Sequence, residues 1–222
     1  MKFKRIIDLS QPFVAGGFQN PAFEDGRVEK CMWYDVEGWN AEKVVFATHT
    51  GSHVDAAFHK FRGGKSIDKY PLERFVGDVI VMDLRHKQPD EEITLDDVRK
   101  EESLICEGMN VFFATGWCKK KKEQTKNIYL YHSPWLGKDA AEYLVEKKVN
   151  AVGIDHFSIG GANSDRVNIS HEILLSADVL IFEGLKLPSV LFEKKVWFMI
   201  GFPLIVKDGS GAPVRMVAME IE

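Results

Sequence analysis

Three histidines and one aspartate fall within eleven consecutive residues of this chain. The segment 44–61 reads VVFATHTGSHVDAAFHKF, and the whole chain of 222 residues has only seven histidines. Imidazole nitrogens combined with a carboxylate oxygen favour Zn²⁺, Mn²⁺ or Fe²⁺ over Mg²⁺ or Ca²⁺. The spacing therefore predicts a divalent-metal site built around His49, His53 and Asp55. His59, four residues further on, is placed to serve as a base beside the metal.

The local backbone decides whether these side chains can meet. His49 and His53 are four residues apart, which on a helix places both on one face. A helix is disfavoured here because glycine costs about 1 kcal/mol relative to alanine in a helix interior, and Gly51 follows a β-branched run. We therefore expect a strand, a sharp turn at Gly51, and an extended return segment. In extended backbone His53 and Asp55 project to the same side, so the three side chains can converge. The plainer alternative is a set of surface or core histidines.

A second group of candidates lies more than a hundred residues downstream. The segment 168–187 reads NISHEILLSADVLIFEGLKL, with His171 before an apolar helical turn and Glu183 at the end of an apolar run. A carboxylate directly after a buried strand lies at the mouth of that strand, where α/β proteins usually build their sites. From this segment alone, a local cap or ion pair for Glu183 is the stronger interpretation.

Strand and helix signals alternate along the chain, which is typical of an α/β fold. Short β-branched or aromatic runs predict strands at 44–48, 78–84, 110–115, 151–155, 179–183, 196–200 and 214–220. A capping box of Thr94 and Asp97 predicts a helix over 95–102, and an apolar face opposite charges predicts another over 138–148. The length and the 45% hydrophobic content suit one globular domain over 1–222.

The charge and hydropathy of the chain argue against nucleic-acid and membrane partners. The net charge of −4 gives no basic surface for nucleic acid or acidic membrane. The N-terminal residues lack the apolar core of a secretory signal, and the longest apolar stretch, 196–206, is too short to span a bilayer. We therefore expect a cytoplasmic protein that acts on a small molecule, with no nucleic-acid or membrane partner.

The three cysteines, at positions 31, 106 and 118, form no CxxC pair. Neither a disulfide framework nor a thiolate zinc site is indicated. A nucleophilic Cys118 is a weaker alternative, because the lysines that follow it could lower its pKa.

Taken together, these segments resemble the cyclase-like metal-dependent hydrolases, the family of bacterial kynurenine formamidase and isatin hydrolase. The family motif HxGTHxDxPxH corresponds to residues 49–59, and its downstream half, a histidine followed twelve residues later by a glutamate in an EGL context, corresponds to His171 and Glu183. Residues 7–10, 115–117, 133–144 and 153–155 also look like the family. The similarity spans most of the chain.

The resemblance implies a role for each residue of the motif. The implied metal ligands are His49, His53, Asp55, His171 and Glu183. The first three hold one ion, while Asp55 and Glu183 bridge to a second ion that His171 also binds. His59 is implied to be the proton donor and acceptor.

The resemblance also implies a fold, a cofactor and a reaction. The fold is a mixed β-sheet or barrel-like core with flanking helices, the swivelling β/β/α type. The cofactor is a pair of Zn²⁺ ions, with Mn²⁺ as the alternative, and the assembly is a homodimer or homotetramer. The reaction is hydrolysis of an amide or ester, such as an arylformamide, a cyclic amide or a lactone, by metal-activated water with His59 as general acid and base.

The chain departs from the family pattern at three places. Ser52 replaces a threonine and keeps the hydroxyl, whereas Ala57 replaces a proline and loosens the turn before His59. The early loop lacks the family's aromatic motif, so Phe18 or Phe23 is expected to line the substrate pocket. Two rivals stay open: a non-catalytic metal-binding protein, and a lactone hydrolase or cyclase of another substrate class on the same fold.

Two further residues follow the predicted strand at 151–155. Asp155 either orients a ligand histidine as an outer partner or caps a local turn. His156, like His86 and His132, is expected to lie outside the site.

Overall fold

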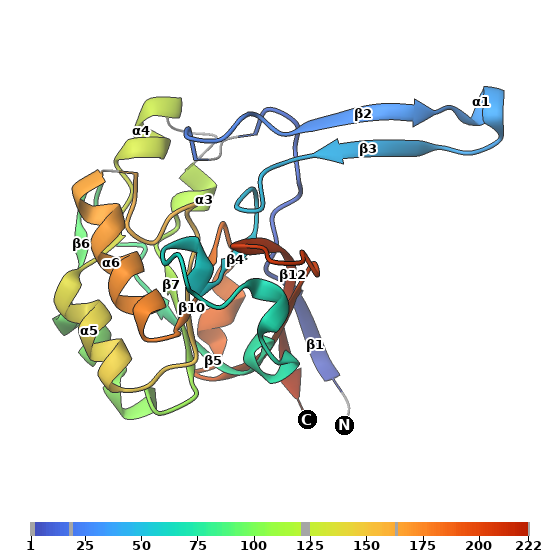
Figure 1. The fold of residues 1–222 in the computed structure, drawn as a ribbon. Coiled ribbons are helices and arrows are strands. Elements are labelled where there is room, and N and C mark those ends of the chain that lie inside the picture. Colours follow the sequence, from blue (N-terminus) through green and yellow to red (C-terminus); the bar gives the residue numbers. More distant parts are fainter. Residues whose placement is uncertain (1–2, 18–19, 121–124, 163, 222) are drawn as a thin grey trace.

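Seven strands close into a ring in the computed structural model, which describes residues 3–17, 20–120, 125–162 and 164–221 (Figure 1). In order around the ring they are β12 (Gly211–Ile221), β11 (Trp197–Pro203), β5 (Val76–Asp83), β7 (Asn110–Ala114), β9 (Ala151–Ile154), β10 (Leu180–Glu183) and β4 (His53–Asp55). β4 pairs back to β12 and closes the ring. Strands β5, β7, β9 and β10 run parallel to one another, whereas β4, β11 and β12 pair antiparallel with their neighbours. The predicted barrel-like mixed sheet is thus confirmed.

The remaining elements surround this ring. β1 (Phe3–Asp8) extends the sheet beside β12, and β6 (Glu92–Ile93) pairs with β8 (Trp135–Leu136). The helices are α1 (Tyr34–Glu37), α2 (Leu95–Arg99), α3 (Trp117–Lys120), α4 (Lys126–Tyr131), α5 (Lys138–Glu146) and α6 (Ser164–Ser176). Short 3₁₀ helices occur at Ala57–His59, Ile67–Lys69, Leu72–Phe75, Glu102–Leu104 and Ser189–Glu193. Among the described residues, no helix is long and apolar enough to cross a membrane.

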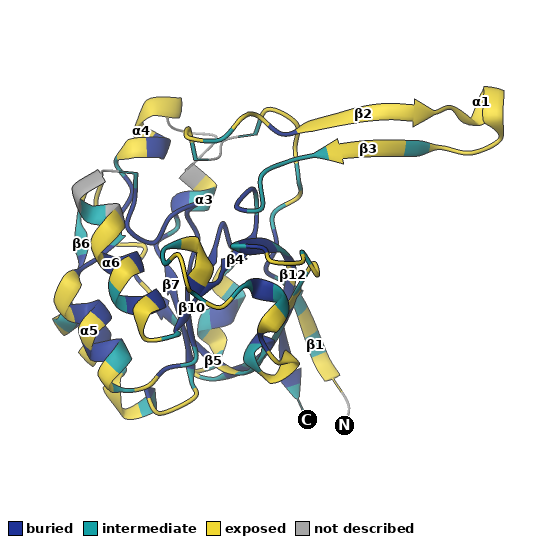
Figure 2. Ribbon diagram, viewed as in Figure 1, coloured by how far each residue is buried: buried dark blue, intermediate teal, exposed yellow. Residues whose placement is uncertain are grey.

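A two-stranded arm extends away from the ring. It consists of β2 (Arg27–Met32) and β3 (Ala41–Val45), with α1 at its tip (Figure 1). Nearly all of its side chains are exposed, including Trp33 and Trp39 (Figure 2). The arm therefore buries little of its own apolar surface within this chain.

Both faces of the central strands are covered, which explains their continuous apolar sequences. Every residue of β7 is buried. Phe112 packs inside the ring in one cluster with Phe182, whose ring centroid is 6.0 Å away. Its neighbour Phe113 belongs to a second cluster, which includes Leu144 of α5 and Leu174 of α6. Alternation of side chains along the strand assigns consecutive residues to opposite cores.

Most elements expected from the sequence are present with changed bounds: β5, β11 and β12 are longer than expected, whereas β7, β9, β10, α2 and α5 are shorter. The capping box of Thr94 and Asp97 begins α2, and α5 ends at Glu146. The strand expected at 44–48 is wrong in its second half, because β3 ends at Val45 and belongs to the arm. Phe46 instead packs its ring 5.3 Å from that of Phe13, and the chain then turns into the site.

Candidate metal centre

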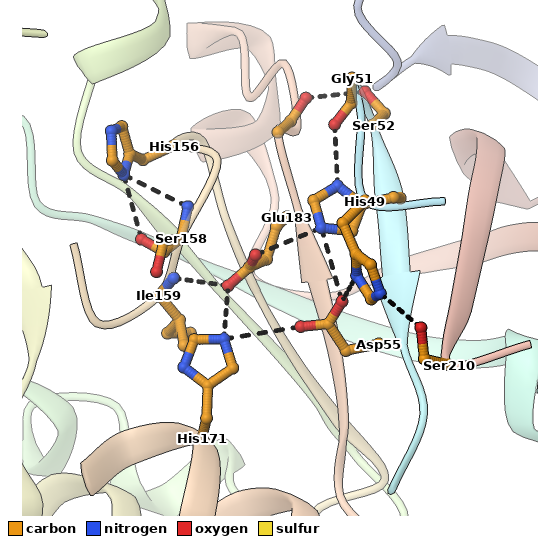
Figure 3. Close-up of polar contacts among 12 residues, drawn as sticks. His49, Gly51, Ser52, Asp55, His156, Ser158, Ile159, His171, Glu183 and Ser210 are labelled. Carbon is orange, nitrogen blue, oxygen red and sulfur yellow. Dashed lines mark hydrogen bonds and ion pairs between the residues drawn. The ribbon is translucent and has the colours of Figure 1, made fainter. Parts of the chain in front are cut away.

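Strand pairing brings the two halves of the predicted site together. β4 and β10 pair antiparallel, with Glu183 opposite His53. Asp55 projects to the same side of β4 as His53, since the two are separated by one residue. α6 carries His171 to the same point, where its ring faces both carboxylates (Figure 3). Side chains more than a hundred residues apart thus form one cluster.

Two glycine turns fix the backbone beside this cluster. Gly51 and Gly184 have positive φ angles of +71° and +65°, which favour glycine. A Cβ atom on Gly184 would lie 2.2 Å from the carbonyl oxygen of Gly51, so any side chain there would collide. The Ser52 hydroxyl donates to the Gly184 carbonyl at 2.7 Å and accepts from the Gln11 N–H at 2.9 Å. The predicted sharp turn at Gly51 is confirmed, and the hydroxyl of Ser52 ties it to β10.

Imidazoles and carboxylates alternate around the centre of the cluster. His53 Nε2 lies 3.4 Å from Asp55 Oδ1 and 3.3 Å from Glu183 Oε2. On the opposite side, His171 Nε2 lies 3.5 Å from Asp55 Oδ2 and 3.3 Å from Glu183 Oε1 (Figure 3). All four residues are buried. The arrangement presents two nitrogen and four oxygen atoms to one small space.

Backbone groups orient two of these side chains. His53 Nδ1 lies 3.0 Å from the Gly51 carbonyl, which turns its Nε2 toward the centre. The Ile159 N–H donates to Glu183 Oε1 at 2.6 Å. Such outer contacts fix the orientation of ligand side chains in metal sites. No sequence signal pointed to Ile159, because a backbone donor can come from any residue type other than proline.

His49 and His59 lie on one side of Asp55. His49 Nδ1 is 2.7 Å from Asp55 Oδ1, and its Nε2 is 2.8 Å from the hydroxyl of Ser210. The rings of His49 and His59 have centroids 3.9 Å apart. His49 is buried, whereas His59 is exposed at the rim. No sequence signal indicated Ser210, which lies in the loop before β12.

The electrostatics of the cluster oppose the effect of burial. Burial alone would raise the carboxyl pKa values, but the surrounding histidines hold the pKa of Asp55 well below its usual range and also lower that of Glu183. Burial would likewise lower the histidine pKa values, but the two carboxylates raise the pKa of His53 and bring that of His171 to about 10. The pKa of His59 is lowered, chiefly by desolvation.

The donor set fits a divalent cation. Two overlapping triads, His49–Asp55–His59 and His53–Asp55–Glu183, each have their ligand atoms within 4.8 Å of one another. Asp55 Oδ2 is buried and makes no well-formed hydrogen bond to a described residue, since its contact with His171 Nε2 is as long as 3.5 Å, although buried polar atoms are rarely left without a hydrogen bond. Nitrogen and carboxylate ligands suit Zn²⁺ or Mn²⁺. His59 lies close enough to be either a ligand or a base.

A cavity of about 240 Å³ opens onto this cluster. Its wall includes Phe23 and Phe157, and the Phe23 ring lies nearly parallel to that of His49 with centroids 6.0 Å apart. Phe23 therefore lines the cavity beside His49, and its contact with a substrate stays a prediction. Phe18 lies outside the described residues.

The alanine that replaces the family proline has a partner of its own. The N–H of Ala57, which a proline would lack, donates to the Tyr70 hydroxyl at 3.2 Å. That hydroxyl donates to Asp178 at 2.6 Å. These contacts hold the 3₁₀ helix that presents His59.

The two residues after β9 have local partners. Asp155 Oδ1 accepts hydrogen bonds from the N–H and the hydroxyl of Thr115, at 2.9 and 2.6 Å. His156 is buried, with Nε2 3.1 Å from the Tyr129 carbonyl and Nδ1 3.1 Å from the Ser158 carbonyl. Burial lowers the pKa of His156 to about 4. Thr115 follows β7, the neighbour of β9, so Asp155 joins the ends of these two strands, which is neither of the two roles expected for it.

Cys118 does not suit nucleophilic catalysis. Burial, together with the charge of Asp155, raises its pKa to about 12. The thiol therefore stays protonated at neutral pH, whereas the thiolate is the reactive form.

Comparison with known proteins gives a consistent result. Residues 7–160 match the model of a family described as "Putative cyclase". The kynurenine formamidase of Salinibacter ruber is 30% identical over 186 residues, covering 82% of this chain and 81% of that protein. The kynurenine formamidase of Bacillus cereus is 27% identical over 224 residues and is covered in full, as is this chain.

Solved structures agree with these relatives. Isatin hydrolase A from Labrenzia aggregata, bound to benzyl benzoate, superposes with a TM-score of 0.86 at 27% identity, covering 98% of this chain and 94% of the other. A structure titled as a potential metal-dependent hydrolase with cyclase activity has a TM-score of 0.78 at 27% identity, covering 98% of both chains.

Proposed function

Because this chain belongs to the cyclase family, whose relatives are metal-dependent hydrolases, we propose that it hydrolyses an amide C–N bond. The substrate class is an arylformamide or a cyclic amide, by analogy with the kynurenine formamidases and isatin hydrolases it resembles. The observation that carries this proposal is the buried ring of His53, Asp55, His171 and Glu183 beneath an open cavity.

Five side chains would hold the cofactor, which we propose to be two Zn²⁺ ions, with Mn²⁺ as the alternative. They are His49, His53, Asp55, His171 and Glu183. Asp55 and Glu183 suit bridging positions, because each faces histidines on both of its oxygens. A divalent cation bound here supplies activation of water and polarisation of the substrate carbonyl.

His59 is proposed to move the proton. Its pKa is lowered, so the ring is largely neutral at neutral pH and can accept a proton from the attacking water. Since His59 is exposed at the rim, the resulting imidazolium would be accessible to return the proton to the departing amine. The ring of His49, tilted by 34° with its centroid 3.9 Å from that of His59, limits the movement of the His59 ring.

A second candidate is hydrolysis of an ester or lactone at the same site. The cavity favours neither linkage, because the same carbonyl position serves both. A non-catalytic metal-binding role is less well supported, since a purely structural site has no use for an exposed histidine beside its ligands or for an adjoining open cavity.

Metal removal tests this proposal. Purified protein should lose hydrolysis of formanilide or isatin after dialysis against a chelator, and Zn²⁺ or Mn²⁺ should restore it. The same preparations should be assayed on an aryl lactone to separate the two linkages. Activity that survives complete removal of metal, verified by elemental analysis, would contradict the proposal.

We also propose that the chain works as a homodimer or homotetramer. The support is the exposed arm, since an isolated two-stranded hairpin is only marginally stable in water and this one exposes Trp33, Val36 and Trp39. Light scattering coupled to gel filtration measures the mass, and a monomer at micromolar concentration would contradict the proposal. The cytoplasmic location and the single-domain organisation stay predictions.

A further inference from the structure

One lysine shares the cavity with the candidate metal ligands. Lys60 follows His59 directly and lines the same cavity wall. Its side chain is only 26% exposed. Its ammonium donates to Asn168 Oδ1 at 2.6 Å and lies 3.1 Å from Glu172 Oε1. Both partners belong to α6, so Lys60 is held in a defined position beside the site.

The charge of Lys60 is not permanently neutralised. Among the described residues that line the cavity, Lys60 is the one lysine or arginine. Glu172 does not line the cavity, and its side chain is 54% exposed. An ion pair with so exposed a partner contributes little, and an ammonium has three donors. An anion in the cavity can therefore engage Lys60 while Asn168 continues to hold it.

The rest of the cavity wall indicates what such an anion would be attached to. Phe23 and Phe157 provide apolar surface in the wall of the same cavity. A substrate whose carbonyl lies at Asp55 and Glu183 must extend toward the rim. We propose that Lys60 determines specificity by binding a carboxylate on the substrate, remote from the bond that is cleaved, and that the preferred substrates are aromatic amides carrying such a group. This inference rests on the proposed hydrolase function.

A matched pair of substrates tests it. 3-Formamidobenzoate carries a carboxylate and formanilide does not. For the metal-loaded wild type, kcat/KM should be about tenfold higher on the anionic substrate, because a charge-assisted hydrogen bond discriminates on this scale. Lys60→Gln should abolish this preference by raising KM for the anion about tenfold, with kcat and the formanilide kinetics little changed.

Two further variants test whether the change in substrate preference is specific to Lys60. Lys65→Gln removes a nearby lysine that has a comparable ion pair, with Asp178 at 3.5 Å, but does not line the cavity, so it should keep the preference. Glu172→Gln removes the competing carboxylate and should lower KM for the anion about threefold, the scale of an exposed ion pair. The inference would be overturned if wild type and Lys60→Gln preferred 3-formamidobenzoate over formanilide equally, or if Lys65→Gln lost this preference as fully as Lys60→Gln.

Binding provides a readout that does not need turnover. Isophthalate should bind the metal-loaded wild type about tenfold more tightly than benzoate in calorimetry, and Lys60→Gln should remove that difference. If neither formamide is hydrolysed, the proposed function fails, and the isophthalate result still decides the role of Lys60. Equal affinities for the two acids in the wild type would exclude the carboxylate subsite.

Discussion

His171 and His156 are both buried beside Glu183, yet their surroundings shift their pKa values in opposite directions. His171 Nε2 faces the carboxylates of Asp55 and Glu183, which raise its pKa to about 10. His156 faces backbone carbonyls, and burial lowers its pKa to about 4. Its own carbonyl accepts the N–H of Gly184, the residue after Glu183. One histidine therefore belongs to the charged cluster, and the other supports the backbone around it.

The difference between the two histidines shows which environment stabilises a positive charge. Desolvation alone favours neutral imidazole, as at His156. In the metal-free chain, protonated His171 supplies positive charge between two buried carboxylates, and the same carboxylates raise the pKa of His53. A metal ion would supply that charge instead, and its binding would release the protons.

The largest expected difference concerns activity. His171→Asn should reduce turnover to the background rate and lower the metal content, because it removes a proposed ligand. His156→Asn should keep both, with a loss of stability. Parallel kinetics and elemental analysis of the two variants give the answer. Normal metal content and activity in His171→Asn would contradict the proposal that His171, unlike His156, is a metal ligand.

His59 sharpens the comparison because it lies at the rim of the cluster. His59→Ala should reduce turnover about 10²–10⁴-fold, the range typical of a general acid–base group, while metal content stays near that of the wild type. A variant that loses its metal would show that His59 is a ligand, as the triad geometry also allows.

Proton release on metal binding is a smaller effect. At pH 7.5 the metal-free chain should release about one to two protons when it binds Zn²⁺, because the pKa values of His53 and His171 are raised. Calorimetry in buffers of different ionisation enthalpy counts these protons. His156→Asn should leave the number unchanged, and a release of zero would contradict the electrostatic account.

Acid stability should show the smallest effect. His156 has a folded pKa near 4, below the unfolded value of about 6.5. The unfolded chain therefore binds more protons between these values, so His156 lowers stability as the pH falls from about 6.5 to 4. His156→Asn should flatten this part of the profile of melting temperature against pH. An unchanged slope would mean that other groups control acid stability.

Local signals predicted much of the fold. The apolar runs of β7, β9 and β10 are continuous because both faces are buried, and Thr94 with Asp97 forms a capping box within four residues. The closure of β4 onto β12 was not predictable from the residues, since it pairs positions about 160 residues apart. The arm was also missed, because its exposed strands lack an apolar alternation.

The site was predictable where side-chain type carries the chemistry. Gly51 indicated the turn, and the spacing of His53 and Asp55 placed both on one side of β4. Glu183 was ambiguous from its own segment, because only the pairing of β10 with β4 places it beside His53. Ser210 and the N–H of Ile159 were missed, since a serine in a loop and a backbone donor carry no distinctive sequence pattern.

The central claim is that one buried cluster, shared around Asp55, holds the metal on which hydrolysis depends. The most direct test is the metal content per chain of wild type and Asp55→Asn after incubation with Zn²⁺ and dialysis, measured beside formanilide hydrolysis. The account predicts bound metal and activity in the wild type, and neither in Asp55→Asn, whose side chain has nearly the same shape without the charge. Equal metal content in the two proteins, or hydrolysis by a metal-free wild type, would contradict it.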